Sequence, residues 1–146
     1  MIKLTGKSKL IVRHKDGRIE STEKHNLILN GGFDFVISKI ITTDSSAPMK
    51  YIALGTGTNE TVATMSGLQT ETNRGQGAWT WSSGSANKTF KISATFAEGT
   101  VLGTITEAGV CNAATGGVFL DRVLYDNPLV GTSDSTITVE FEFGVV

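Results

Sequence analysis

Cysteine, proline and long apolar runs are all scarce in this chain, and each scarcity excludes a class of protein. A single cysteine among 146 residues, Cys111, excludes an internal disulfide framework. No apolar run approaches the roughly 20 residues that a membrane-spanning helix needs. Residues 1–17 lack the apolar core of a signal peptide, so we expect a cytoplasmic origin. Two prolines against 17 glycines favour many tight turns, as in an all-β protein.

A strong charge of either sign is also absent. Lysine and arginine number 13 and aspartate and glutamate 14, a formal net charge of -1 at pH 7, so no overall field attracts nucleic acid or an anionic membrane. Charged residues make up 18% and apolar residues 39%, too few charges for a disordered chain. Length and composition therefore predict one folded domain over residues 1–146, with neither nucleic acid nor a membrane as a partner.

Strand signals recur along the chain. Residues 9–13 and 19–24 flank Asp16-Gly17, a dipeptide typical of a hairpin turn. Residues 137–145 alternate apolar and polar without error, which indicates a strand with one buried and one wet face. Further strands are expected at 49–54, 88–96, 100–106, 106–112 and 117–124. Such short strands separated by turns predict an antiparallel β-sandwich, Ig-like or jelly-roll-like, in which the N-terminal hairpin pairs with the C-terminal strand.

One short helix is expected near residues 31–42. After Asn30 and two glycines, apolar residues recur at spacings of three and four, which is typical of an amphipathic helix. We expect Asn30 to cap this helix and the apolar stripe to pack across an open end or face of a sheet. The residues of the stripe are Phe33, Val36, Ile37, Ile40 and Ile41.

The stretch from residue 59 to residue 87 shows little periodicity and is rich in glycine, serine, threonine and asparagine. This length without a strong element is unusual in a compact domain, so the stretch either hides strands or forms an extended loop or arm. Trp79 and Trp81 would share a strand face and, with Arg74, form a candidate contact or ligand surface, either a sugar-stacking platform or a protein-contact patch. The alternative is that both indoles belong to the core. One arginine beside two tryptophans is too few cations for single-stranded nucleic acid.

Cys111 is the candidate nucleophile, since it lies in the glycine-rich segment TEAGVCNAATGG at 106–117. A reactive thiolate needs a base, but His14 and His25, the only histidines, lie in or beside the N-terminal hairpin, and no local signature brings them to the cysteine. We therefore expect a small, buried cysteine. Gly109 would let two backbones approach closely, and residues 113–117 would form a turn.

Metal and phosphate sites lack their usual spacing. Neither CxxC nor HxxxH is present, and Asp121, Asp126 and Asp134 are too dispersed for a calcium loop. Residues 55–58, GTGT, resemble a phosphate-binding loop only superficially, because no Gly-Lys-Ser/Thr ending follows. We predict no catalytic residue, no metal and no cofactor, and hence a protein that is not an enzyme.

Three segments carry a resemblance to a known class of protein. In chain order they are Lys15-Asp16-Gly17 with NLILNGG at 26–32; YIALGTGT at 51–58 with Leu68 and Glu71; and ITEAGVCNA at 105–113 with Gly116, Gly117, Leu120, Arg122 and a closing strand at 135–144. Together they resemble small structural proteins of tailed-bacteriophage virions, particularly tail, tail-tip and collar components of long-tailed phages. Such proteins often have an aromatic or aliphatic residue at the position of Cys111, which further weakens a catalytic cysteine.

The resemblance implies a shared fold and a non-enzymatic role in the virion, assembled in the host cytoplasm. The expected protein is a homo-oligomer, in a ring, in the tail at the collar, baseplate or fibre-attachment region. Its partners would be copies of itself and other virion proteins of the tail tube, fibre or capsid. Two alternatives stay open: a capsid decoration (cement) protein, and a receptor- or carbohydrate-binding module that takes a host surface glycan on Trp79 and Trp81.

Overall fold

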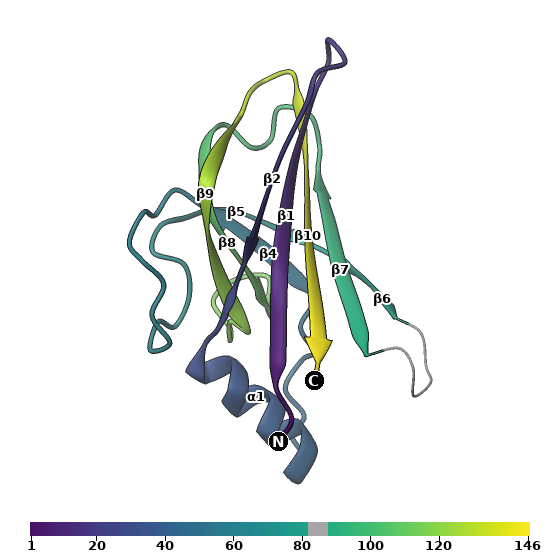
Figure 1. Cartoon of the computed structure of the whole chain (residues 1–146), viewed down its shortest axis with the longest axis vertical. Coiled ribbons are helices and arrows are strands. Elements are labelled where there is room, and N and C mark those ends of the chain that lie inside the picture. Colours follow the sequence, from purple (N-terminus) through teal and green to yellow (C-terminus); the bar gives the residue numbers. More distant parts are fainter. Residues whose placement is uncertain (82–87) are drawn as a thin grey trace.

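The part of the chain that the structure describes, residues 1–81 and 88–146, forms two antiparallel sheets in the computed structural model (Figure 1). The prediction of an all-β sandwich is confirmed. The first sheet contains, in spatial order, β2 (Ile19–His25), β1 (Leu4–His14), β10 (Ser135–Val145), β7 (Thr89–Phe96) and β6 (Ala78–Trp81). The second contains β3 (Leu27–Ile28), β9 (Asp121–Gly131), β8 (Gly103–Cys111), β4 (Tyr51–Gly55) and β5 (Glu71–Gln76).

The predicted N-terminal hairpin forms, and β1 pairs with β10 as expected. Gly17 takes the left-handed conformation, with φ of 93°, and the Asp16 carboxylate accepts a hydrogen bond from the N–H of Arg18 at 2.9 Å. The β1–β10 ladder runs from Leu4 opposite Val145 to the far end of both strands, so it joins the two ends of the chain. A long non-local ladder of this kind organises the first sheet around β10, which β7 pairs on its other side.

The alternating pattern of β10 places its apolar side chains in the core between the sheets. Ile137, Val139, Phe141 and Phe143 are fully buried, while Glu140 and Glu142 lie on the opposite face. Each such side chain removed from water stabilises the fold by about 1.5–3 kcal/mol. A buried hydrogen bond of 2.7 Å between the hydroxyls of Ser8 in β1 and Tyr125 in β9 links the two layers.

Strands account for part of the stretch at 59–87. β5 and β6 are edge strands of different sheets, separated only by Gly77, whose N–H donates to the carbonyl of Lys50 at 2.8 Å. The polar sequence of β5 hid that strand, whereas the alternation of Trp79 and Trp81 had indicated β6. Residues 59–70 form a loop against the second sheet, and residues 82–87 of the predicted loop or arm at 59–87 lie outside the described residues.

Two strands differ in extent from their predicted ranges. The predicted 100–106 and 106–112 strands form one strand, β8, and the strand predicted at 117–124 begins later and continues to Gly131 as β9. Gly109 allows this pairing as expected, since a Cβ there would lie 2.6 Å from the carbonyl oxygen of Asp121. The turn after Cys111 uses Gly116 and Gly117, with φ of 60° and 79°.

The predicted helix is confirmed as α1 (Asn30–Ile41), but its expected cap is wrong. Leu29 occupies the N-cap position and makes no side-chain hydrogen bond there. It is fully buried and donates its N–H to Leu120, so the chain enters the helix from the core. Asn30 is consequently the first helical residue, and its N–H donates to the carbonyl of Ala63 at 2.9 Å.

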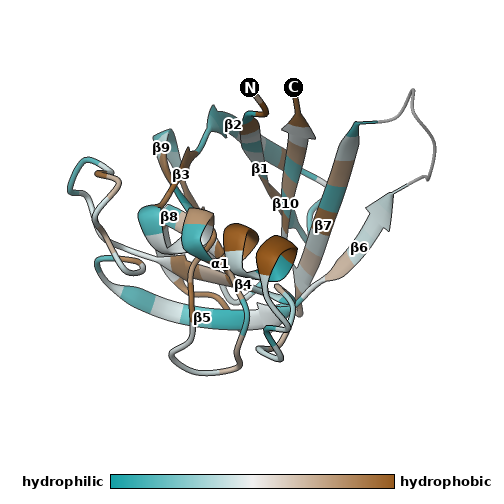
Figure 2. Ribbon diagram, turned by 90° about the horizontal axis from the view of Figure 1, so that it is seen from below, coloured by the Kyte–Doolittle hydropathy of each residue, from teal (hydrophilic) through white to brown (hydrophobic). Residues whose placement is uncertain are grey.

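The apolar stripe of α1 does not pack as predicted. The helix lies across one end of the sandwich, and it is seated through Gly32, which contacts the backbone of Leu120, and through Phe35 and Val36 (Figure 2). The side of α1 that meets the core therefore differs from the predicted side. Most of the stripe faces outward: the exposed fractions are 44% for Phe33, 50% for Ile37, 76% for Ile40 and 72% for Ile41.

Candidate functional site

Arg74 lies in β5 of the second sheet, whereas Trp79 and Trp81 lie in β6 of the first. The Arg74 guanidinium pairs with both carboxylate oxygens of Glu71, at 2.6 and 2.7 Å, and donates to the carbonyl oxygens of Ala113 and Gly116 at 2.7 and 2.8 Å. Its side chain therefore fastens the turn at 113–117 to the sheet.

The two tryptophans have different environments. Trp79 packs against Phe90 and Phe143, with ring centroids 5.6 and 6.0 Å away, and its indole N–H donates to the carbonyl of Met49 at 2.7 Å. Trp81 is 69% exposed at the end of β6. Trp79 thus packs against the core, which was the alternative to a contact surface, and of the two indoles only Trp81 is largely exposed.

Cys111 is buried, as predicted, beside Leu29, Ala53 and Phe119. Burial raises the pKa of the thiol to about 11, so it is protonated near neutral pH. The histidines have partners within the N-terminal hairpin: His14 contacts Glu20 at 2.9 Å, and His25 contacts the carbonyl of Gly6 at 3.4 Å. A protonated thiol in an apolar cluster is a packing residue.

Neither a metal cluster nor a membrane-spanning helix is found among residues 1–81 and 88–146. No group of three or more His, Cys, Asp or Glu side chains there is arranged to hold a metal ion. No helix in the same residues is long and apolar enough to cross a bilayer.

A buried ion pair between Glu107 in β8 and Arg122 in β9 is the centre of the second sheet's outer face. Both side chains are 0% exposed, and Nε of Arg122 donates to Oε2 of Glu107 at 2.7 Å. The carboxylate also accepts the backbone N–H groups of Gly57, Gln69 and Thr70 at 2.8–2.9 Å. One side chain therefore fastens both ends of the loop at 57–70.

Charge and hydrogen bonding compensate the burial of this pair. Burial raises the pKa of Glu107, but the hydrogen bonds from Thr70 and Gln69, followed by those from Arg122 and Gly57, outweigh it and hold the pKa below its ordinary value. Glycine is required at position 57, since a Cβ there would lie 2.5 Å from Oε1 of the carboxylate. Sequence reasoning used Glu107 and Arg122 only as markers of resemblance. The available signal was one residue of each charge in two neighbouring strand segments that also contain apolar residues.

Asp121 is a second buried carboxylate, next to Arg122 in β9. It is fully buried, its Oδ1 accepts the N–H of Val110 at 2.9 Å, and its Oδ2 accepts a hydrogen bond from Nδ2 of Asn26. Burial raises the pKa of Asp121 to about 7, because these two donors offset only part of the cost of desolvating the charge.

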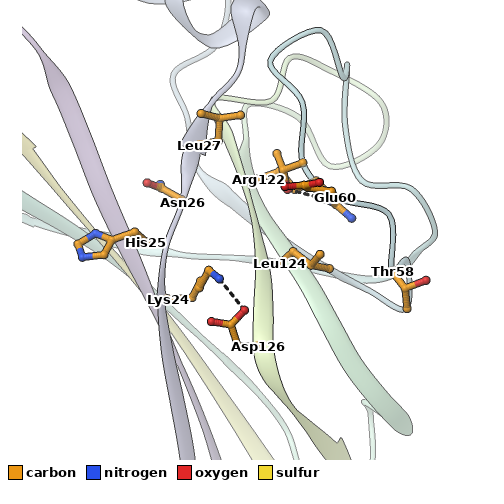
Figure 3. A pocket seen from close by; sticks show the side chains of 10 residues that line it. Lys24, His25, Asn26, Leu27, Thr58, Glu60, Arg122, Leu124 and Asp126 are labelled. Carbon is orange, nitrogen blue, oxygen red and sulfur yellow. Dashed lines mark hydrogen bonds and ion pairs between the residues drawn. The ribbon is translucent and has the colours of Figure 1, made fainter.

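A groove of about 490 Å³ lies beside these buried groups, between β2, the β2–β3 crossover, β9 and the loop at 58–61 (Figure 3). Lys24 and Asp126 form an ion pair of 2.6 Å along one side of it. Arg122 of β9 and Glu60 of the loop at 58–61 lie near each other at the other side (Figure 3). The lining residues are Lys24, His25, Asn26, Leu27, Thr58, Glu60, Thr61, Arg122, Leu124 and Asp126.

Comparison of the chain with protein-family models, with curated proteins and with solved structures found no match. Any inference about the class of protein therefore depends on the fold and on the surface groups described above. These comprise a two-sheet sandwich, an outward-facing apolar helix and a groove lined by hydrogen-bonding side chains.

Proposed function

We propose that this protein is a non-enzymatic structural component of a tailed-phage virion. In this role it assembles as a homo-oligomeric ring in the tail, at the collar, baseplate or fibre-attachment region. The proposal is supported by the resemblance of the three sequence segments and by the outward-facing apolar side of α1. Its partners are copies of itself and neighbouring virion proteins, and its location is the virion.

The exposed side of α1 is the observation that carries the proposal. Phe33, Ile37, Ile40 and Ile41 lie on one side of a single helix, and contiguous exposed apolar side chains of this kind mark protein contacts. Two polar side chains of α1 are engaged within the chain: Lys39 donates to the carbonyls of Asp44 and Ser46, and the Ser38 hydroxyl donates to Asp44 at 2.7 Å. A mostly apolar face remains for a neighbouring subunit, with the exposed Asp34 at its edge.

A closed ring needs a heterologous contact, in which two different surfaces of the same protein meet between neighbouring subunits. Trp81 is the second contact that we propose, because it is a large exposed aromatic at the end of an edge strand. Aromatic residues are enriched at such interfaces because they bury a large area at low entropic cost.

Light scattering of the purified protein, coupled to size exclusion, tests the assembly. We expect a mass that is a multiple of 15.5 kDa at high concentration, and a monomer for the double variant Ile37→Lys/Ile40→Lys. The matched control is Ile19→Lys, which changes an isoleucine that is also exposed but lies in the N-terminal hairpin, and it should assemble like the wild type. A wild-type protein that stays monomeric throughout contradicts the proposal.

A further inference from the structure

We propose that residues 26–29, which connect β2 to α1, form a clasp that holds the helix on the sandwich while Asp121 is neutral and opens when Asp121 ionises. The clasp contains β3 and the residue on either side of it. Because the device lies within one chain, it does not depend on the proposed assembly role.

Few contacts hold the clasp in place. β3 lies at the edge of the second sheet and pairs with β9 over two residues. Beside this short ladder, the N–H of Asn26 donates to the carbonyl of Gly6 at 3.1 Å, and the N–H of Leu29 donates to the carbonyl of Leu120 at 3.0 Å. Segments with so little pairing open locally while the rest of a fold stays intact. Since α1 begins directly after Leu29, opening the clasp also frees the start of the helix.

Asp121 lies beneath the clasp, opposite Ile28 in the β3–β9 register, and is fully buried. Its Oδ2 accepts a hydrogen bond from Nδ2 of Asn26, and its Oδ1 accepts the N–H of Val110 at 2.9 Å. One carboxylate oxygen is therefore bound to the clasp and the other to β8. Both donors are neutral, and no cation among residues 1–81 and 88–146 pairs with this carboxylate, so its charge is poorly compensated while the clasp is closed.

The closed clasp also leaves one polar atom unsatisfied. Oδ1 of Asn26 is buried without a hydrogen-bond partner in the part of the chain that the structure describes. An unmet buried acceptor costs free energy that water recovers once the segment opens. Water is close, because a surface hollow of about 270 Å³ is lined by Asn26 and by both residues of β3. A small displacement of the clasp therefore hydrates both Asn26 and Asp121.

The buried ionisable groups near Asp121 do not offset its charge. Burial raises the pKa of Cys111 to about 11 and also raises the pKa of Tyr125, so both side chains are neutral near pH 7. The guanidinium of Arg122 is committed to Glu107 at 2.7 Å.

The other charged groups on the surrounding elements lie at the surface. Lys24 pairs with Asp126 at 2.6 Å and Lys7 pairs with Glu23 at 3.4 Å, while Asp34 of α1 is exposed. His25 is the remaining titratable neighbour; it is exposed and contacts the carbonyl of Gly6 at 3.4 Å. A control must therefore separate Asp121 from His25.

Proton linkage sets the direction and the window of the opening. The pKa of Asp121 is about 7 in the closed state and returns toward its ordinary value of 3.8 when water reaches the carboxylate. The closed state binds the proton more tightly, so the opening constant should rise about tenfold per pH unit between about pH 4 and 7 and level off above that range.

The test is amide hydrogen exchange of the isotope-labelled full chain, followed by NMR between about pH 5 and pH 8, with each rate divided by the intrinsic rate of its amide. We expect the opening constants of Asn26 and Leu29 to rise about tenfold per pH unit and then to level off near pH 7. At every pH they should exceed, by at least about tenfold, the opening constant of Val139 in the central strand β10, which reports global unfolding.

Two variants identify the group that titrates. Asp121→Asn should abolish the rise at Leu29, because asparagine carries no proton equilibrium, whereas the matched control His25→Gln should keep it. The proposal is overturned if the wild-type Leu29 opening constant does not change with pH. It is also overturned if Leu29 and Val139 give equal constants, because the clasp then opens only with the whole fold, or if His25→Gln removes the rise.

Discussion

The side chain of Glu107 joins β8 to β9 and to the loop at 57–70. Its two oxygens accept four hydrogen bonds, three from backbone N–H groups of the 57–70 loop and one from Arg122. A buried carboxylate is costly unless it is paired and fully hydrogen-bonded, and here both conditions hold. The loop and β9 therefore depend on one side chain of β8.

Replacing Glu107 with alanine should lower the free energy of unfolding by about 3–5 kcal/mol, because the change leaves Arg122 buried without its counter-charge. Urea denaturation measures the loss. The control, Glu98→Ala, removes a half-exposed carboxylate that meets Lys15 at 3.8 Å, and should cost less than about 1 kcal/mol. Equal losses for the two variants would contradict the role assigned to Glu107.

Asp121 should make stability fall as pH rises from about 5 to about 7. Its pKa is raised from 3.8 to about 7 in the folded state, so across this window the folded protein binds more protons than the unfolded chain. The stabilisation is full below the unfolded pKa and is lost as pH rises through the folded pKa. Glu107 acts at lower pH, because its lowered pKa makes stability fall on acidification below about 4.5.

The variant Asp121→Asn isolates this effect, because asparagine can still accept the N–H of Val110 and carries no proton equilibrium. Thermal unfolding at a series of pH values should give a flatter profile for the variant than for the wild type between pH 5 and 7. If the two proteins lose stability in parallel between pH 5 and 7, Asp121 does not titrate in this range and the prediction is wrong.

At the scale of elements, strands with apolar residues or a clear turn signal could be predicted, and a polar edge strand could not. β10 alternates cleanly, so its periodicity identified it, and the Asp16-Gly17 turn signal identified the β1–β2 hairpin. β5 is polar because it is an edge strand, and its pattern carries no burial signal. The position of α1 was predicted correctly. Its apolar stripe, however, does not reveal whether those side chains pack against the protein's own core or against another subunit.

The buried polar site was beyond sequence reasoning for a related reason. Glu107 and Arg122 are 15 residues apart, and their pairing depends on the register between β8 and β9. Their loop partners at 57, 69 and 70 are backbone groups, and only the glycine at 57 leaves a mark on the sequence. Cys111 was easier, because burial is the usual state of a free cysteine.

Alanine substitutions at two adjacent glycines of α1, Gly31 and Gly32, should change the free energy of unfolding in opposite directions. A Cβ at Gly32 would overlap the carbonyl of Leu120, so Gly32→Ala should cost about 1–3 kcal/mol through overpacking. A Cβ at Gly31 would meet only Val118 at 3.9 Å, so Gly31→Ala should gain up to about 1 kcal/mol from helix propensity. Chemical denaturation measures both changes. A neutral Gly32→Ala variant would contradict the seating of the helix on Leu120.

At the scale of the whole molecule, the proposed assembly surface on α1 lies next to the groove. The chain ends meet beside each other, with Lys3 and Val146 exchanging two backbone hydrogen bonds, and α1 lies at the same end of the sandwich (Figure 1). Trp81 lies at the end of β6, and the groove lies between β2 and β9. Phe33 of α1 lines a second hollow together with His25, Asn26 and Leu27, which also line the groove, so the assembly surface and the groove are neighbours.

Cryo-electron microscopy of the intact particle tests the central claim most directly, since it locates every copy of the protein. The account predicts a ring of this chain in the tail, with Phe33, Ile37, Ile40 and Ile41 of each copy buried against the next copy. A lattice of copies on the capsid would replace the tail role with that of a decoration protein. A particle without the protein, or copies whose α1 faces solvent, would contradict the account.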